Sequence, residues 1–176
     1  MCFFAWEEPS CRLRKGETTQ MNETTRSLEE ARSVIEEEYR SRHGELFPPG
    51  AQFARVDFVD PLECPNADWG YSQESDTLRV ALNDGDLQDI NGAIVGMEIR
   101  ASLQYQPAWR IYLLHEICHE YQYKVLSDQP DEWGIRACEA HQRKWLGPGH
   151  TPAFYSAINA MAACLGVDPE ALVDSL

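Results

Sequence analysis

The sequence has no excess of basic residues and no long apolar run. Its 15 Lys and Arg residues stand against 29 Asp and Glu residues, which gives a formal net charge of −14. A surface that follows nucleic-acid phosphates needs cations, so we expect no nucleic-acid partner. No run approaches the roughly 18 consecutive apolar residues of a membrane-spanning helix, so we expect no membrane span. Residues 1–6 are too few for a signal peptide and lack its basic residues, which favours a cytoplasmic protein.

Closely spaced cysteine pairs are also missing. The 6 cysteines are scattered, and no two of them form a C-x-x-C pair. A chain of 176 residues can form a core without disulfide bonds, so reduced thiols are expected. Zinc ribbons and treble-clef modules are excluded, because they are built from such pairs. A metal site in this chain would need other ligands.

The length and patterning favour one domain. Residues 1–26 are polar and show no sustained period, so they are predicted to form a flexible N-terminal arm. Residues 27–176 are then the single domain. Ser27 and Glu30 have the spacing of a capping box, which predicts a helix over residues 27–44.

A small sheet and several helices are expected after that helix. Strands are predicted at residues 52–59, 77–82 and 95–103, and the last alternates apolar and polar residues with a period of two. Helices are predicted at residues 108–125 and 130–145, at residues 152–166, and in a short turn from residue 168. The fold class is therefore α+β, with a small three-stranded sheet, antiparallel or mixed, and further helices.

The helix at residues 108–125 is apolar almost all round, which predicts a central, buried helix. It contains His115, Glu116 and His119 in an H-E-x-x-H pattern. A spacing of four residues places both imidazoles on one helix face, where they can reach one tetrahedral ion. Buried polar groups cost free energy unless they are paired or bind metal, so zinc is favoured over two purely structural histidines.

Glu116 is the predicted catalytic residue. It projects beside the histidine face, where it can take a proton from a zinc-bound water and pass it to a leaving amine. Cys118 lies inside the motif but points away from that face, so a role in core packing is expected. Tyr121, Tyr123 and Tyr155 are each candidates to stabilise an oxyanion.

A catalytic zinc needs three protein ligands and one open position, and three downstream residues are candidates for the third ligand. Glu139 lies 20 residues after His119 on the following predicted helix, similar to the glutamate of thermolysin-like enzymes. It can alternatively accept a hydrogen bond from a ligand imidazole. His150 precedes the next helix, and His141 is the weakest candidate. His43 is interpreted as a surface residue near a helix end.

Two segments resemble the SprT-like zinc metalloproteases: residues 113–122 (LLHEICHEYQ) and residues 149–155 (GHTPAFY). The resemblance spans about residues 95–166. It implies a minimal zincin-like metalloprotease domain in which His115, His119 and His150 bind Zn²⁺. It also implies that the strand at residues 95–103 pairs with an extended peptide substrate.

The expected function is therefore a zinc-dependent metallopeptidase that cleaves peptide bonds in a peptide or protein substrate. The alternative is a zincin-fold module that binds zinc and serves regulation or interaction without general protease activity. The sequence carries no signal for an oligomeric state.

Overall fold

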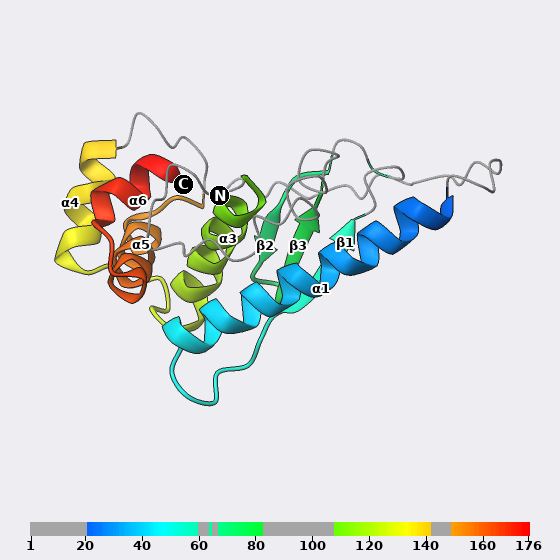
Figure 1. The fold of residues 1–176 in the computed structure, drawn as a ribbon. Helices are drawn as coiled ribbons and strands as arrows, with labels where there is room; N and C mark the ends of the chain where they lie inside the picture. Colours follow the sequence, from blue (N-terminus) through cyan, green and yellow to red (C-terminus); the bar gives the residue numbers. More distant parts are fainter. Residues whose placement is uncertain (1–20, 60–63, 65–66, 83–107, 142–148) are drawn as a thin grey trace.

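A computed structural model describes residues 21–59, 64, 67–82, 108–141 and 149–176. These residues form an α+β fold with five helices and one three-stranded sheet, so the predicted fold class is confirmed at this level (Figure 1). Within these ranges, no helix is long and apolar enough to cross a membrane.

The sheet is mixed, with strand order β1-β3-β2. β1 (Arg55–Val59) runs parallel to β3 (Thr77–Ala81), and β2 (Gly70–Ser72) runs antiparallel to β3. β1 and β3 were predicted, whereas β2 lies between two predicted strands in a segment for which no strand was predicted. The third predicted strand, residues 95–103, lies outside the described residues.

The first helix, α1, spans Met21–Leu46 and is longer than predicted. It begins six residues before Ser27, so the predicted capping box at Ser27 is wrong and residue 27 lies in the helix interior. Ala31, Ile35 and Tyr39 are buried and form the inner face of α1.

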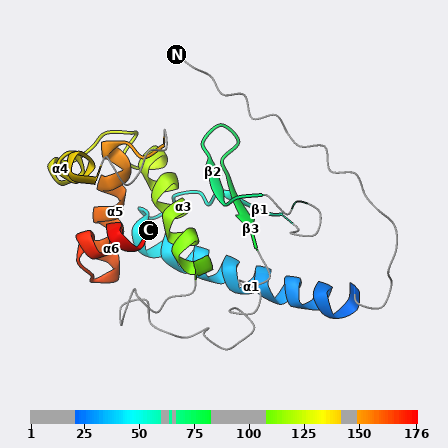
Figure 2. The ribbon, with the colours of Figure 1, turned by 90° about the horizontal axis from the view of Figure 1, so that it is seen from above.

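The central helix α3 (Ala108–Lys124) agrees with its prediction. It lies between the sheet on one side and the three C-terminal helices on the other, and α1 runs across both parts (Figures 1 and 2). Its apolar side chains join the core from several faces, and Trp109, Leu113 and Ile117 are almost completely buried. The polar side chains of α3 therefore lie in or beside the core.

Three helices follow α3: α4 (Glu132–His141), α5 (Pro152–Leu165) and α6 (Pro169–Ser175). α5 starts at Pro152, as predicted, and ends at Leu165, one residue before the predicted end. Gly166 caps it in a left-handed conformation with φ of 67°. The Asp168 side chain accepts a hydrogen bond from the Glu170 N–H and caps α6. α5 packs on both α3 and α4, so it joins the two halves of the helical layer.

The prediction that all cysteines are reduced is wrong for Cys64, which is disulfide-bonded. Cys118 and Cys138 are free thiols, as predicted. The sequence did not predict this bond, because disulfide pairing cannot be deduced from the spacing of cysteines in the chain.

Candidate metal centre

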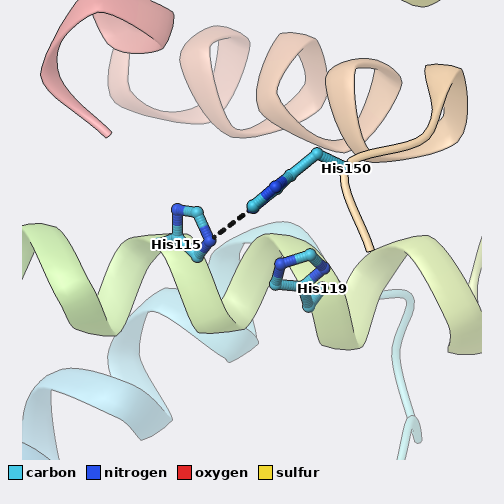
Figure 3. Close-up of side chains that lie close together, drawn as sticks. All are labelled: His115, His119 and His150. Atoms are coloured by element: carbon cyan, nitrogen blue, oxygen red, sulfur yellow. Dashed lines mark hydrogen bonds between the residues drawn. The ribbon is translucent and has the colours of Figure 1, made fainter. Parts of the chain in front are cut away.

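Three histidines from two parts of the chain converge beside α3. His115 and His119 lie one turn apart on α3, and His150 reaches toward them from the segment before α5 (Figure 3). One ring nitrogen from each lies within 4.8 Å of those of the other two, and the Nε2 atoms of His115 and His150 are 3.1 Å apart. In the described part of the chain, this is the one group of three or more His, Cys, Asp or Glu side chains with such spacing.

The separation of the His115 and His150 nitrogens fits a tetrahedral zinc ion. With Zn–N bonds of about 2.0–2.1 Å, two ligand nitrogens lie about 3.3 Å apart. The separation of 3.1 Å between His115 and His150 is close to that value. Three neutral nitrogen donors match the ligand set of catalytic zinc sites, which leave a fourth position open.

The three imidazoles are held in their neutral form. Burial, followed by repulsion from the neighbouring histidines, lowers the pKa of His115 to about 3. Burial and the His150 charge lower the pKa of His119 to about 4, and burial also lowers the pKa of His150. A ring without a second proton keeps a lone pair, which is the form that binds a metal.

Other groups fix the orientation of these rings. The Nδ1 atom of His119 lies 3.2 Å from Oε1 of Gln122, and the His115 ring is hydrogen-bonded to the backbone of Leu176. Phe154 packs against all three rings and stacks on His119, with ring centroids 4.3 Å apart. Such contacts fix the orientation of a metal-ligating side chain before the metal binds.

Glu116 lies on the side of α3 that faces β2. Its side chain is 7% exposed, and its carboxylate accepts a hydrogen bond from the backbone N–H of Tyr71 in β2. Burial raises the pKa of Glu116 to about 7, and the Tyr71 N–H opposes that rise. The carboxyl group can therefore both accept and release a proton near neutral pH.

The other candidates for a third ligand do not join this group. Glu139 is exposed on α4, and His141 is 2.9 Å from Glu170 of α6. Cys118 is completely buried in the core, as predicted. Burial, reinforced by the charge of Glu116, raises the pKa of the Cys118 thiol, so it stays protonated.

The interpretation of His43 as a surface residue is wrong. Its side chain is buried, stacks on Phe47 with ring centroids 3.8 Å apart, and lies 3.6 Å from Glu120. The sequence placed it near the end of a helix, but it could not show that Phe53 also packs on this ring. Burial lowers the pKa of His43.

The three candidate tyrosines occupy different surroundings. Tyr121 packs edge-on against Phe47, and Tyr155 is buried and stacks beside His141. Tyr123 stacks on Tyr71, whose N–H reaches Glu116. Of the three, Tyr123 is therefore the one with a neighbour that contacts the candidate catalytic residue.

The sequence interpretation did not find Gln122, Leu176 or Tyr71 as contacts of the site. Gln122 gave a detectable signal, because it is polar on a helix predicted to be buried all round, three residues after His119. Leu176 and Tyr71 contribute backbone groups, and such contacts cannot be predicted from residue type.

We compared the chain with family models, curated proteins and solved structures, and none of them matches it.

Proposed function

We propose that this protein is a zinc-dependent metallopeptidase of the SprT-like type. His115, His119 and His150 would hold the zinc ion, and Glu116 would act as the general base. The observation that carries the proposal is the convergence of three imidazoles, two from α3 and one from the segment before α5, on a helix that also carries the buried Glu116.

The chemistry follows from the groups around the site. When bound, zinc would supply a Lewis acid for the peptide carbonyl and lower the pKa of a water. Glu116 takes a proton from the attacking water and delivers it to the leaving nitrogen. The Tyr71 N–H of β2 holds the Glu116 carboxylate by a hydrogen bond. The products are a new carboxylate and a new amine, so one water is consumed for each bond that is cleaved.

The first test compares zinc content with peptide cleavage. We expect the wild-type protein, purified without chelator, to hold about one zinc per chain by elemental mass spectrometry and to cleave an unfolded protein substrate. Glu116→Gln should keep the zinc and lose about 10²–10⁴-fold in rate, because it cannot take the proton. A Glu116→Gln protein that cleaves as well as the wild type would contradict the proposal.

Two further variants test the ligand set. His150→Ala should lose most of the zinc, whereas Glu139→Ala should keep it, since Glu139 is exposed on α4. Zinc that is retained in His150→Ala but lost in Glu139→Ala would move the third ligand to Glu139. A fully zinc-loaded wild type that cleaves no unfolded protein would favour a regulatory or interaction module.

A further inference from the structure

We propose that Gln122 and Asp128 are positioning residues that together select the metal-binding tautomer of His119 and fasten the turn that carries His150. The inference rests on the proposed zinc site, which it deepens. Neither residue touches the reacting atoms, so they would act on the chemistry through the two histidines.

Gln122 uses all of its side-chain hydrogen-bonding groups within the protein. It is completely buried. Its Oε1 lies 3.2 Å from Nδ1 of His119. Its Nε2 donates to Oδ1 of Asp128 over 2.9 Å and to Oγ1 of Thr151 over 3.1 Å. A buried amide with every group paired has one stable orientation.

That orientation is dictated by Asp128. An ionised carboxylate only accepts hydrogen bonds, so the NH₂ group of Gln122 must face Asp128. The carbonyl oxygen of Gln122 then faces His119 and also only accepts. The proton of the neutral His119 ring must therefore lie on Nδ1. The lone pair is left on Nε2, the nitrogen available to zinc.

The same group of residues holds the turn with the third histidine. Thr151 follows His150 in the chain, and its hydroxyl donates to Oδ1 of Asp128 over 3.1 Å. The turn also lies close to the His119 ring, because a Cβ on Gly149 would lie 3.1 Å from Cε1 of His119. The two ligands that come from different elements are therefore linked through Gln122 and Asp128.

The backbone after α3 is shaped to bring Asp128 to this position. Ser127 and Asp128 have φ of 49° and 58°, in the left-handed region that non-glycine residues seldom adopt. The Asp128 N–H donates to the backbone oxygen of Gln122 over 3.0 Å. Asp128 thus contacts Gln122 through both its backbone and its side chain.

The test begins with Gln122→Met, which keeps the size of the side chain and removes its polar groups. We expect the zinc dissociation constant, measured by competition with a chelating dye, to rise about 10–100-fold. In the zinc-free protein, long-range ¹⁵N–¹H spectra of the imidazoles should show His119 protonated on Nδ1 in the wild type. In Gln122→Met a substantial fraction should be protonated on Nε2. The His119 signals are assigned by their absence from the spectrum of His119→Gln.

A pair of charge changes provides the rescue. In Gln122→Glu, the new carboxylate can still accept from His119 but faces the carboxylate of Asp128, so zinc affinity should fall. Adding Asp128→Asn gives that carboxylate an NH₂ donor, and the double variant should recover to within about threefold of the wild type. A merely structural role of Gln122 predicts no such recovery and no change of tautomer.

Gln129→Met is the matched control, because Gln129 is exposed seven residues later. It should leave both zinc affinity and the tautomer unchanged. Wild-type affinity and tautomer in Gln122→Met, or a double variant no better than Gln122→Glu, would overturn the inference. If the wild type binds no zinc, the proposed function fails, but the tautomer of the zinc-free protein still decides the role of Gln122.

Discussion

At the scale of single residues, the buried charge of Glu120 shows how α3 is held in place. Glu120 is completely buried and accepts hydrogen bonds from the Tyr39 hydroxyl at 2.8 Å, the Lys124 ammonium at 2.8 Å and the Ala54 N–H at 3.2 Å. A buried carboxylate is tolerable only with such partners. Because Tyr39 belongs to α1 and Ala54 to the segment before β1, these two contacts fix α3 and so the position of its histidines.

Asp131 provides a pH-dependent prediction at this scale. It precedes α4 and accepts from the Gly134 N–H at 2.6 Å, from the Ser156 hydroxyl and from the Asn159 amide. Partial burial acts to raise the pKa of Asp131, but these hydrogen bonds outweigh it and leave the pKa below its usual value. A lowered pKa in the folded state stabilises the protein above the unfolded-state pKa of about 3.9, and this contribution is lost as the pH falls through the folded-state pKa.

We therefore expect Asp131→Ala to lower the free energy of unfolding by about 1 kcal/mol at pH 7, since it removes a helix cap. The difference from the wild type should shrink as the pH falls from about 4, the unfolded-state pKa, through the lower folded-state pKa of Asp131. Asp131→Asn keeps a capping group without the charge and should fall between the two at pH 7. Urea unfolding at pH 7, 5 and 3 measures the free energy of unfolding of the wild type and both variants. A difference between wild type and Asp131→Ala that stays constant with pH would contradict the prediction.

The metal-site residues differ in how far the sequence could predict them. His115, Glu116 and His119 follow from helical spacing alone, because their relative positions are set by one element. His150 came from the resemblance of its segment, and the structure brings its ring to the other two. The meeting of Gln122, Asp128 and Thr151 was not predictable, because it depends on two left-handed residues at a turn.

At the scale of elements, α4 and α5 approach closely at Gly134. A Cβ on this glycine would collide with the backbone oxygen of Pro152 and the hydroxyl of Ser156, and would lie 2.7 Å from the Ser156 backbone nitrogen. Two of these atoms belong to the backbone of α5, so they cannot move away by a change of side-chain rotamer. The contact therefore requires glycine.

We expect Gly134→Ala to lower the free energy of unfolding by about 1–3 kcal/mol, the usual cost of overpacking. Gly44→Ala is the matched control, because Gly44 lies in α1 with no atom within 4 Å of its Cβ position. This control should gain up to about 1 kcal/mol from helix propensity. Thermal and urea unfolding of the two variants should shift in opposite directions, and equal shifts would show that α4 and α5 separate easily.

Element prediction succeeded where a long pattern was present. α3 is a long segment that is apolar almost all round, and α5 has marked ends, so the bounds of both were predicted to within one residue. β2 has only three residues, one of them glycine, and depends on pairing with β3. A segment that short carries no period, so its strand conformation is decided by its neighbour.

At the scale of the whole molecule, the three histidines connect α3 with the segment that leads into α5. A metal bound by all three would link these parts and stabilise the folded state by mass action. At a free zinc concentration 100 times the dissociation constant, the gain is about 2.7 kcal/mol. For a protein of this size that corresponds to about 5–10 °C in Tm.

We therefore expect chelator to lower the Tm of the zinc-loaded protein by about that amount, as followed by differential scanning fluorimetry. His150→Ala should have the low Tm with or without chelator. His141→Ala, which removes a histidine outside the group, should respond to chelator like the wild type. A wild-type Tm that chelator does not change would indicate that the histidines are purely structural.

The contact of Gln122 with Asp128 also bears on how related chains can be recognised. It joins the H-E-x-x-H pattern to two further positions at fixed spacing, which gives H-E-x-x-H-x-x-Q followed by five residues and an aspartate. The five intervening residues include the end of α3 and the turn, so an insertion or deletion there would separate the pair. Distant homologues that keep this arrangement should therefore vary in the composition of the turn but not in its length.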